Sequence, residues 1–347
     1  MTNHQPEDAP RNTKVKILTT LLGLVAIALL GYYLFQNRMV FSSLGNVTVL
    51  QITLIIGLET IVVILGSVVN YSMVRRFGYR VTFLDSVLLQ YINNFLNKIL
   101  PTIGGGAAFR AVFLKKKYQF PYSQFVATLG GFYLINFIAT SLIGLCCMAW
   151  IYLQYGETNW VIISAFLLLI IPSLLIVFFT PKIPGGNNRI SNALRRATEG
   201  WNILKKDKGF ISFYAVVIIV QLLLSSAEML IAFNAIGVHT GYIQTLYLSS
   251  LGIILSFLNF TPDGIGIREA VYVFSSSVVQ IPQASLVLAS LVLRALSIVT
   301  SLSIGGVGYL VFLKQIKKIE ETQGSKSDLS ASIELPRNTD PPSLEMN

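Results

Sequence analysis

The segment TPDGIGIREA, residues 261–270, combines a proline, two glycines and several charged side chains between apolar runs. Glycines let a backbone turn sharply and approach a ligand closely. A helix beginning near Ile267 would point its positive end at this turn, where Arg268 adds a cation that grips phosphate in a forked geometry. We expect Asp263 to cap that helix and Glu269 to pair with an arginine. The segment therefore predicts an anion-binding turn, with a capped interfacial turn as the alternative.

Arg294 lies within the last apolar run, at a depth of roughly 15 Å for a helical rise of about 1.5 Å per residue. A central arginine costs about 2.5–3.5 kcal/mol on insertion scales, so we expect it to have a partner or to face water. The candidate partners are Glu59, Glu228 and Glu269. Glu59 and Glu228 lie in apolar spans of their own, where each is either a proton-coupling carboxylate or the mate of an arginine. A purely structural ion pair is the alternative role for Arg294.

A second polar break, NNFLNKILPTIGGGAAFR, occupies residues 93–110. The polar residues that we expect to line a groove there are Asn93, Asn94, Asn97 and Lys98. Arg110 would do in this break what Arg268 does in the other, and a wet interfacial helix is the alternative. The residues predicted to bind a substrate are Arg268, Arg294, Glu269, Asp263, Gly264, Gly266, Arg110, Asn94 and Asn97.

Other kinds of site find little support in the sequence. The two cysteines, Cys146 and Cys147, are adjacent and predict neither a disulfide framework nor a metal site. The two histidines, His4 and His239, exclude a centre built from several histidines. No Walker motif is present. We therefore expect no metal and no cofactor, and an enzyme is the less favoured reading.

The elements that must position these residues are membrane helices. Apolar residues make up 53% of the 347 residues and charged residues only 12%, which excludes a soluble enzyme. The apolar runs are long enough for α-helices rather than barrel strands. We predict an all-α polytopic membrane protein of eight to ten helices, with about six full spans and two broken, re-entrant hairpins. The six spans lie at about 15–35, 47–70, 122–153, 160–180, 210–233 and 284–313, and the hairpins at about 83–114 and 242–279.

The predicted domain organisation is one transmembrane domain, residues 15–315, between two disordered tails, 1–14 and 316–347. An amphipathic linker helix at about 189–205 would lie on the membrane surface. Within the domain, repeat units at about 47–153 and 209–313 would each contain a span, a broken hairpin and a second span.

An internal repeat underlies that division. Residues 78–96 align with 237–255 at an offset of 159, and Arg110 aligns with Arg268 at an offset of 158. Three full spans separate the starts of the two units, so the units would have opposite orientations in the membrane. Inverted repeats of this kind are common in transporters, whose substrate sites lie near the midplane where broken helices meet.

Charge sets the expected orientation. The net charge is +10, and most of the 26 basic residues fall in segments that share one side of the predicted topology. By the positive-inside rule, that side is the cytoplasm, and both termini lie there. We therefore expect a protein of the cytoplasmic membrane whose partners are lipid headgroups and not nucleic acid. The sequence does not indicate an oligomeric state.

The two breaks resemble the signatures of the lysylphosphatidylglycerol synthase transmembrane family, also described as flippase-like integral membrane proteins. The carriers of the resemblance are the sequence from Pro262 to Glu269, the basic Arg294 in the following span, and the Asn-rich break at 93–110. The likeness extends over about residues 15–315. In the family an acidic residue usually stands shortly before the first arginine, where this chain has Ala107 and Ala108.

The resemblance implies translocation of a modified or glycan-linked lipid between leaflets. Some members add a soluble aminoacyl-transferase domain, which we expect this chain to lack because its longest soluble piece is the tail, residues 314–347. The leading hypothesis is therefore a lipid translocator that moves a phosphate-containing or modified lipid. The alternatives are an accessory or scaffold protein for a separate lipid-modifying enzyme, and a membrane-embedded transferase that acts on a glycan-linked or aminoacylated lipid.

Overall fold

The computed structural model describes residues 47–99, 105–179, 204–257 and 261–315, together with a few isolated positions. Every regular element in this part of the chain is helical. The helices are α2 (Val49–Arg76), α3 (Phe83–Ile99), α4 (Gly105–Tyr118), α5 (Tyr122–Tyr155), α6 (Trp160–Phe179), α8 (Lys208–Ala235), α9 (Tyr242–Ser256), α10 (Ile267–Phe274), α11 (Ser276–Val279) and α12 (Gln283–Thr300).

Five helices are long and apolar enough to cross a membrane: α2, α5, α6, α8, and α12 with its continuation to Gln315. The prediction of an all-α polytopic membrane protein is confirmed. The first predicted span, at about 15–35, and the linker helix at about 189–205 fall outside the described residues apart from scattered positions. The two tails, 1–14 and 316–347, lie outside them entirely.

The ends of the long helices follow local chemistry. The hydroxyl of Thr48 accepts a hydrogen bond from the Gln51 N–H, and the Gln51 side chain accepts one from the Thr48 N–H, which forms a capping box at the start of α2. α5 ends at Gly156, whose φ of 72° is a left-handed conformation that glycine adopts without strain. α2 runs to Arg76, past the predicted end at residue 70, and the basic side chains of Arg75 and Arg76 in its last turn interact favourably with the helix C-terminus.

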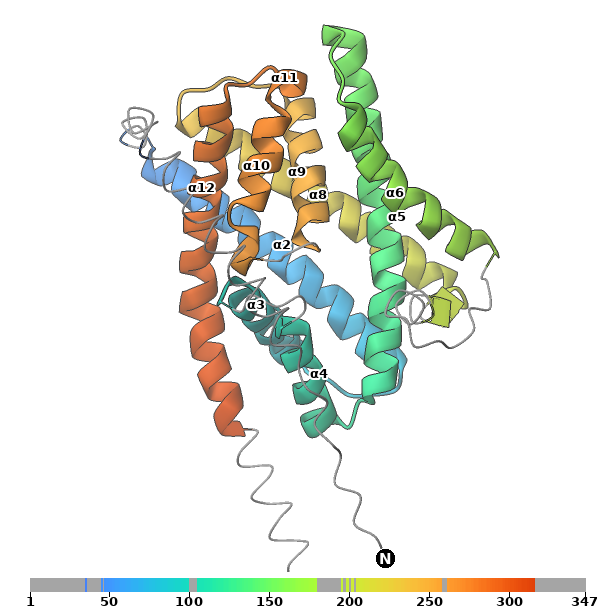
Figure 1. Ribbon diagram of the computed structural model, residues 1–347. Coiled ribbons are helices and arrows are strands. Elements are labelled where there is room, and N and C mark those ends of the chain that lie inside the picture. The colour runs from blue at the N-terminus through green and yellow to red at the C-terminus, as the bar shows by residue number, and fades with distance from the viewer. Residues whose placement is uncertain are drawn as a thin grey trace, which may run out of the picture.

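Two broken hairpins lie on opposite sides of the neighbouring helices α2 and α8. In Figure 1, α2 and α8 cross the middle of the molecule, α3 and α4 lie below them, and α9, α10 and α11 lie above. We call α3 with α4 the first hairpin, and α9 to α11 with the turn between α9 and α10 the second hairpin. α5 and α12 run along the two flanks. The fold therefore brings both breaks towards the centre.

Packing between the hairpins and the flanking helices is reciprocal. α3 of the first hairpin packs on the continuation of α12, and α9 of the second hairpin packs on α5. The first contact is close, because a Cβ added to Gly305 would lie 2.5 Å from the Tyr91 carbonyl oxygen. Each hairpin thus packs on the final span of the other predicted unit, as two copies related by a two-fold axis would.

One hydrogen bond lies where such an axis would pass. The side-chain amide of Gln221 on α8 donates to the carbonyl of Val62 on α2 over 2.9 Å. The two residues are 159 positions apart, the same offset that aligns the two units. Equivalent positions of two copies can touch only near the axis that relates them. The contact supports the repeat, whose inverted orientation in the membrane stays a prediction.

The second half departs from regular helix in three places. At the break, Asp263, Gly264 and Gly266 have φ values of 52°, 67° and 84°. The apolar stretch that follows, predicted as one piece at 271–279, is divided at Ser275 into α10 and α11. The continuation of α12 includes a π-helical segment, Ser301–Gly306, which no residue in the sequence signalled. Segments of this kind are frequent at functional sites.

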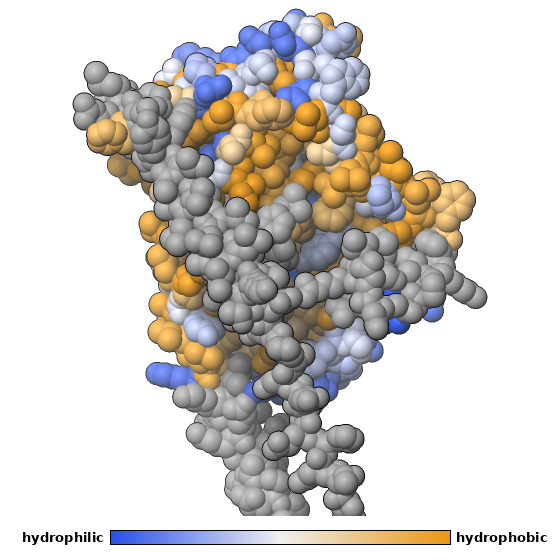
Figure 2. All heavy atoms as spheres, viewed as in Figure 1, coloured by the Kyte–Doolittle hydropathy of each residue, from blue (hydrophilic) through white to orange (hydrophobic). Residues whose placement is uncertain are grey.

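Apolar side chains cover the flanks of the molecule. Figure 2 shows apolar residues over most of the visible sides and hydrophilic residues gathered at the upper and lower ends. Large apolar side chains such as Leu153, Leu168 and Phe178 are mostly exposed. Exposure on this scale fits a surface that faces lipid tails.

Candidate functional site

A polar cavity of about 520 Å³ lies where the two hairpins approach each other. This volume is in the ordinary range for ligand sites. The first hairpin, the second hairpin, α2, α5 and α8 all contribute side chains to its wall. Its polar lining residues are Asn70, Gln90, Asn93, Asn94, Asn97, Lys98, Arg110, Tyr133, Asn136, Tyr214, Gln221, Ser256, Asp263 and Arg268.

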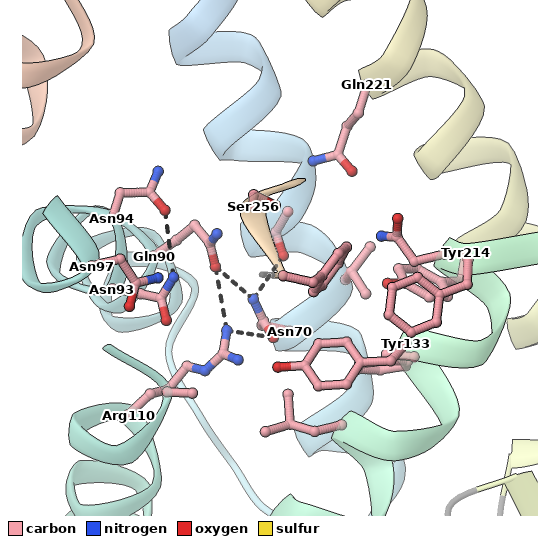
Figure 3. A pocket seen from close by; sticks show the side chains of 18 of the residues that line it. Asn70, Gln90, Asn93, Asn94, Asn97, Arg110, Tyr133, Tyr214, Gln221 and Ser256 are labelled. Atoms are coloured by element: carbon pink, nitrogen blue, oxygen red, sulfur yellow. Dashed lines mark hydrogen bonds between the residues drawn. The ribbon is translucent and has the colours of Figure 1, made fainter. Parts of the chain in front are cut away.

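Arg110 reaches this cavity from α4 through a cradle of neutral amides. Its Nη1 donates to Asn70 Oδ1 over 3.1 Å and to Gln90 Oε1 over 3.3 Å. The Asn70 amide also donates to Gln90 Oε1 over 2.9 Å, so the three side chains form one network (Figure 3). The guanidinium carbon lies 5.2 Å from the centre of the Phe125 ring. These contacts fix the direction of the guanidinium.

The charge of Arg110 is nevertheless uncompensated. Arg110 is only 8% exposed, and among the described residues it forms no ion pair. Its buried Nε has no hydrogen-bond partner there. Amide oxygens accept hydrogen bonds but carry no net charge, so they do not neutralise a buried cation. An anion in the cavity would supply the missing charge.

The asparagines of α3 have two kinds of task. Asn97 lines the cavity, and its Oδ1 accepts a hydrogen bond from the Gly106 N–H over 3.1 Å, which ties the start of α4 to α3. Asn93 donates to Asn94 Oδ1 over 3.4 Å, and both lie on the cavity wall. A Cβ added to Gly106 would lie 2.4 Å from the Asn93 carbonyl oxygen, so this close approach requires glycine.

The second hairpin carries a buried ion cluster. Arg294, 5% exposed, donates from Nη2 to Glu269 Oε1 over 2.8 Å, and its Nε lies 3.5 Å from Asp263 Oδ2. Ser290 also donates to Glu269 Oε1, over 2.9 Å. The other oxygen of Glu269 accepts from the Gly266 N–H over 2.9 Å, at the start of α10. One carboxylate therefore caps the half-helix and holds the arginine.

The capping role predicted for Asp263 is wrong. Asp263 has left-handed backbone geometry in the turn, and its carboxylate faces Arg294 instead of the N–H groups of α10. Gly266 precedes the helix, and the Glu269 side chain folds back to its N–H. Glu269 is in the first turn of α10, where an acidic side chain can reach back to the cap position.

Arg268 completes the cavity from the second hairpin. It lines the wall, and its buried Nε has no hydrogen-bond partner in the described part of the chain. Like Arg110 it forms no ion pair with a described residue. The charged residues of the wall are thus Lys98, Arg110 and Arg268 against the single carboxylate of Asp263.

The predicted substrate-binding residues fall into two groups. Those that line the cavity are Arg110, Asn94, Asn97, Asp263 and Arg268. Those that hold the turn behind it are Gly264, Gly266, Glu269 and Arg294. The second group positions Asp263 and Arg268 and does not form the wall. Its members are predictable from the sequence because charged residues and glycines stand out within apolar runs.

The sequence interpretation missed the polar residues contributed by the long spans. These are Asn70 on α2, Tyr133 and Asn136 on α5, and Tyr214 and Gln221 on α8. The available signal was a carboxamide inside an otherwise apolar run, since such a group is costly in lipid without a polar partner. The carboxamides in the long spans lie outside the two breaks and were therefore not included in the predicted site.

Neither predicted coupling carboxylate lies on the cavity wall. Glu59 accepts hydrogen bonds from Ser297 on Oε1 and from Thr300 on Oε2, the latter over 2.8 Å. Lys98 on the wall donates to the same Ser297 hydroxyl over 2.5 Å. Glu228 Oε1 is buried and has no hydrogen-bond partner among the described residues.

The arrangement can bind an anion. Three cations from two hairpins face one space, and amides and tyrosines supply further hydrogen bonds. Guanidinium groups hold phosphate or carboxylate oxygens through paired hydrogen bonds. In the described residues, no group of three or more His, Cys, Asp and Glu side chains is placed to hold a metal ion.

One family model matches most of the chain. Residues 18–305 match the family model described as the lysylphosphatidylglycerol synthase TM region. A UPF0104 membrane protein of Methanocaldococcus jannaschii is 23% identical over 328 residues, which cover 88% of this chain and 97% of the relative. Because the family match spans most of its length, this chain belongs to the lysylphosphatidylglycerol synthase transmembrane-region family and is an integral membrane protein.

Proposed function

We propose that this protein translocates a lipid with an anionic, phosphate-containing headgroup across the membrane. The observation that carries the proposal is the cavity between the hairpins, where Lys98, Arg110 and Arg268 face a single carboxylate. A headgroup phosphate between Arg110 and Arg268 would be held by both predicted repeat units. Its charge would offset two guanidinium groups that have no ion pair with a described residue.

The surroundings of the cavity suit a lipid better than a soluble anion. Large apolar side chains are exposed on the outer faces of α5 and α6, where acyl tails would lie. The headgroup would cross through the polar cavity while its tails stay in the bilayer. Family membership supports a function related to membrane lipids, and broken helices that meet at a polar centre are common in transporters.

The transferase alternative requires a nucleophile or base beside the bound lipid. The wall offers one carboxylate, Asp263, which lies 3.5 Å from Arg294 Nε and is oriented as an ion-pair partner. The observations therefore favour binding and movement over group transfer. A scaffold role for a separate enzyme would need no charged cavity.

The test is translocation in reconstituted vesicles. The purified protein would be placed in phosphatidylcholine vesicles that contain a fluorescently labelled phosphatidylglycerol, and a membrane-impermeant quencher would report the fraction in the outer leaflet over time. We expect Arg268→Ala and Arg110→Met each to slow translocation at least about tenfold, because each removes charge-assisted hydrogen bonds worth about 1.5–3 kcal/mol.

The matched control is Arg80→Ala, which removes an exposed arginine from the loop between α2 and α3. We expect it to keep the wild-type rate. Translocation at the wild-type rate in both cavity variants would show that the site assignment is wrong. A lipid product of changed mass, instead of the same lipid in the other leaflet, would favour the transferase.

A further inference from the structure

A polar chain leads away from the cavity through three helices. Lys98 on α3 lines the cavity wall, and its ammonium donates to Ser297 Oγ on α12 over 2.5 Å. The Ser297 hydroxyl donates in turn to Glu59 Oε1 on α2. Thr300, one turn further along α12, donates to Glu59 Oε2 over 2.8 Å. The chain thus connects a cation that an anionic ligand would approach with a carboxylate behind the wall.

Each helix packed against Glu59 contributes to its charge environment. α3 contributes Lys98, and α12 contributes the hydroxyl groups of Ser297 and Thr300. α8 contributes Glu228, a second carboxylate that interacts electrostatically with Glu59. Lys98 also interacts with Asp263 and Arg268 across the cavity and with Arg294.

Lys98 is therefore shared between two sites. It is the cation whose hydrogen bond is bridged to Glu59 through Ser297, and it is one of three cations on the cavity wall. A bound phosphate would draw the ammonium towards the cavity and weaken its link to Glu59. The Glu59 carboxylate, which interacts electrostatically with both Lys98 and Glu228, would then have less positive charge to offset the second carboxylate.

We propose that binding of an anionic headgroup in the cavity is coupled to uptake of one proton by Glu59, with Lys98 as the connecting group. The coupling rests on the proposed function and adds an energy source to it. The Glu59 carboxylate gains a proton from water that reaches the site, and no other bond changes. A singly charged phosphodiester and one proton together leave the net charge of the site unchanged, which lowers the cost of moving the loaded site within the membrane.

Linkage gives the expected sign. Because the liganded state would bind one more proton than the empty state, affinity for the anion should fall as pH rises. The largest slope that one proton can give is about tenfold in affinity per pH unit. Replacing Glu59 with the neutral Gln should mimic the protonated carboxylate and fix affinity near its low-pH value.

The experiment is calorimetric titration of the full chain, in phosphatidylcholine nanodiscs, with glycerophosphoglycerol. This probe is a soluble phosphodiester whose single charge does not titrate near neutral pH. Repeating the titration in buffers of different ionisation enthalpy counts the protons taken up per anion bound. We expect about one in the wild type and about none in Glu59→Gln, whose affinity should vary less than about twofold with pH.

Three further variants identify the groups involved. Glu157→Gln makes the same change at an exposed position after α5 and should keep the wild-type proton count. Lys98→Met should weaken binding and abolish proton uptake, because it removes the connecting cation. Proton uptake that persists in Glu59→Gln but disappears in Glu228→Gln would place the proton on Glu228 and overturn the proposal.

The outcomes also distinguish a failure of the proton coupling from a failure of the proposed anion site. Wild-type binding without proton uptake would overturn the coupling and leave the anion site intact. No binding of the phosphodiester at any pH would overturn both the anion site and the coupling. Equal proton uptake in the wild type and in Glu59→Gln would likewise exclude Glu59 as the acceptor.

Discussion

The two hairpins place an arginine at equivalent positions of the predicted repeat and surround it differently. In the second hairpin, Arg268 stands beside a buried cluster in which Glu269 and Asp263 neutralise Arg294. In the first hairpin, Arg110 is held by amides and an aromatic ring, and no described carboxylate pairs with it. Both Arg110 and Arg268 lack an ion pair with a described residue, but only Arg268 has an ion-paired cluster beside it.

This difference separates structural charge from functional charge. A buried ion pair holds its partners in place whether or not a ligand is present, and removing one partner leaves the other uncompensated. An arginine surrounded by neutral groups is already uncompensated, so replacing it with a neutral residue removes the desolvation penalty of a buried charge. The same substitution should therefore have opposite effects on stability in the two halves.

The largest effect is expected at Arg294. Arg294→Met removes the cation shared by Asp263 on the cavity wall and Glu269 behind it, and leaves both carboxylates without that partner. We expect a loss of about 3–5 kcal/mol in folding stability, measured by thermal unfolding of the purified protein in detergent. Arg80→Ala, at an exposed position, should stay within about 0.5 kcal/mol. A loss no larger than that control would mean that the cluster does not stabilise the second hairpin.

An intermediate effect is expected at Gly106, where the arms of the first hairpin touch. In Gly106→Ala the new Cβ would meet the Asn93 carbonyl oxygen at 2.4 Å, and backbone cannot move aside as a flexible side chain can. We expect a loss of about 1–3 kcal/mol by the same unfolding measurement.

The matched control for that substitution is Gly57→Ala on α2, whose Cβ would have nothing within 4 Å. It should stabilise the protein by about 0.5–1 kcal/mol, because alanine favours helix over glycine. If both alanine variants behaved alike, the close contact between α3 and α4 would not be a feature of the folded protein.

The smallest effect on stability is expected at Arg110. Arg110→Met keeps the volume and removes the uncompensated charge, so its unfolding temperature should correspond to a change within about 1 kcal/mol or to a gain. Stabilisation by added glycerophosphoglycerol should disappear in the same variant. A loss as large as that of Arg294→Met would show that Arg110 has a structural partner, and the contrast between the hairpins would fail.

The breaks and their charged residues were predictable from sequence because charge and glycine are conspicuous in apolar surroundings. The start of α10 at Ile267 was predicted correctly for that reason. The assignment of the cap to Asp263 was wrong, since sequence order does not show that a side chain three residues into the helix folds back. Which carboxylate pairs with Arg294 was also open, because Glu59, Glu228 and Glu269 are far apart in the chain.

The composition of the cavity depended on packing that no single segment encodes. Asn70, Gln90 and Arg110 form one network only because α2, α3 and α4 converge on it. The π-helical turn at Ser301–Gly306 was equally invisible, since its residues are compatible with ordinary helix. It packs against α3, where a Cβ on Gly305 would lie 2.5 Å from the Tyr91 carbonyl oxygen.

The most direct test of the anion site is native mass spectrometry of the gently purified protein, which identifies the lipid it retains. We expect an enriched lipid with a phosphate-containing headgroup in the wild type and in Arg80→Ala. Retention should fall at least about tenfold in Arg110→Met and in Arg268→Ala. Equal retention of the same bulk lipids in all four proteins would contradict an anion site between the two hairpins.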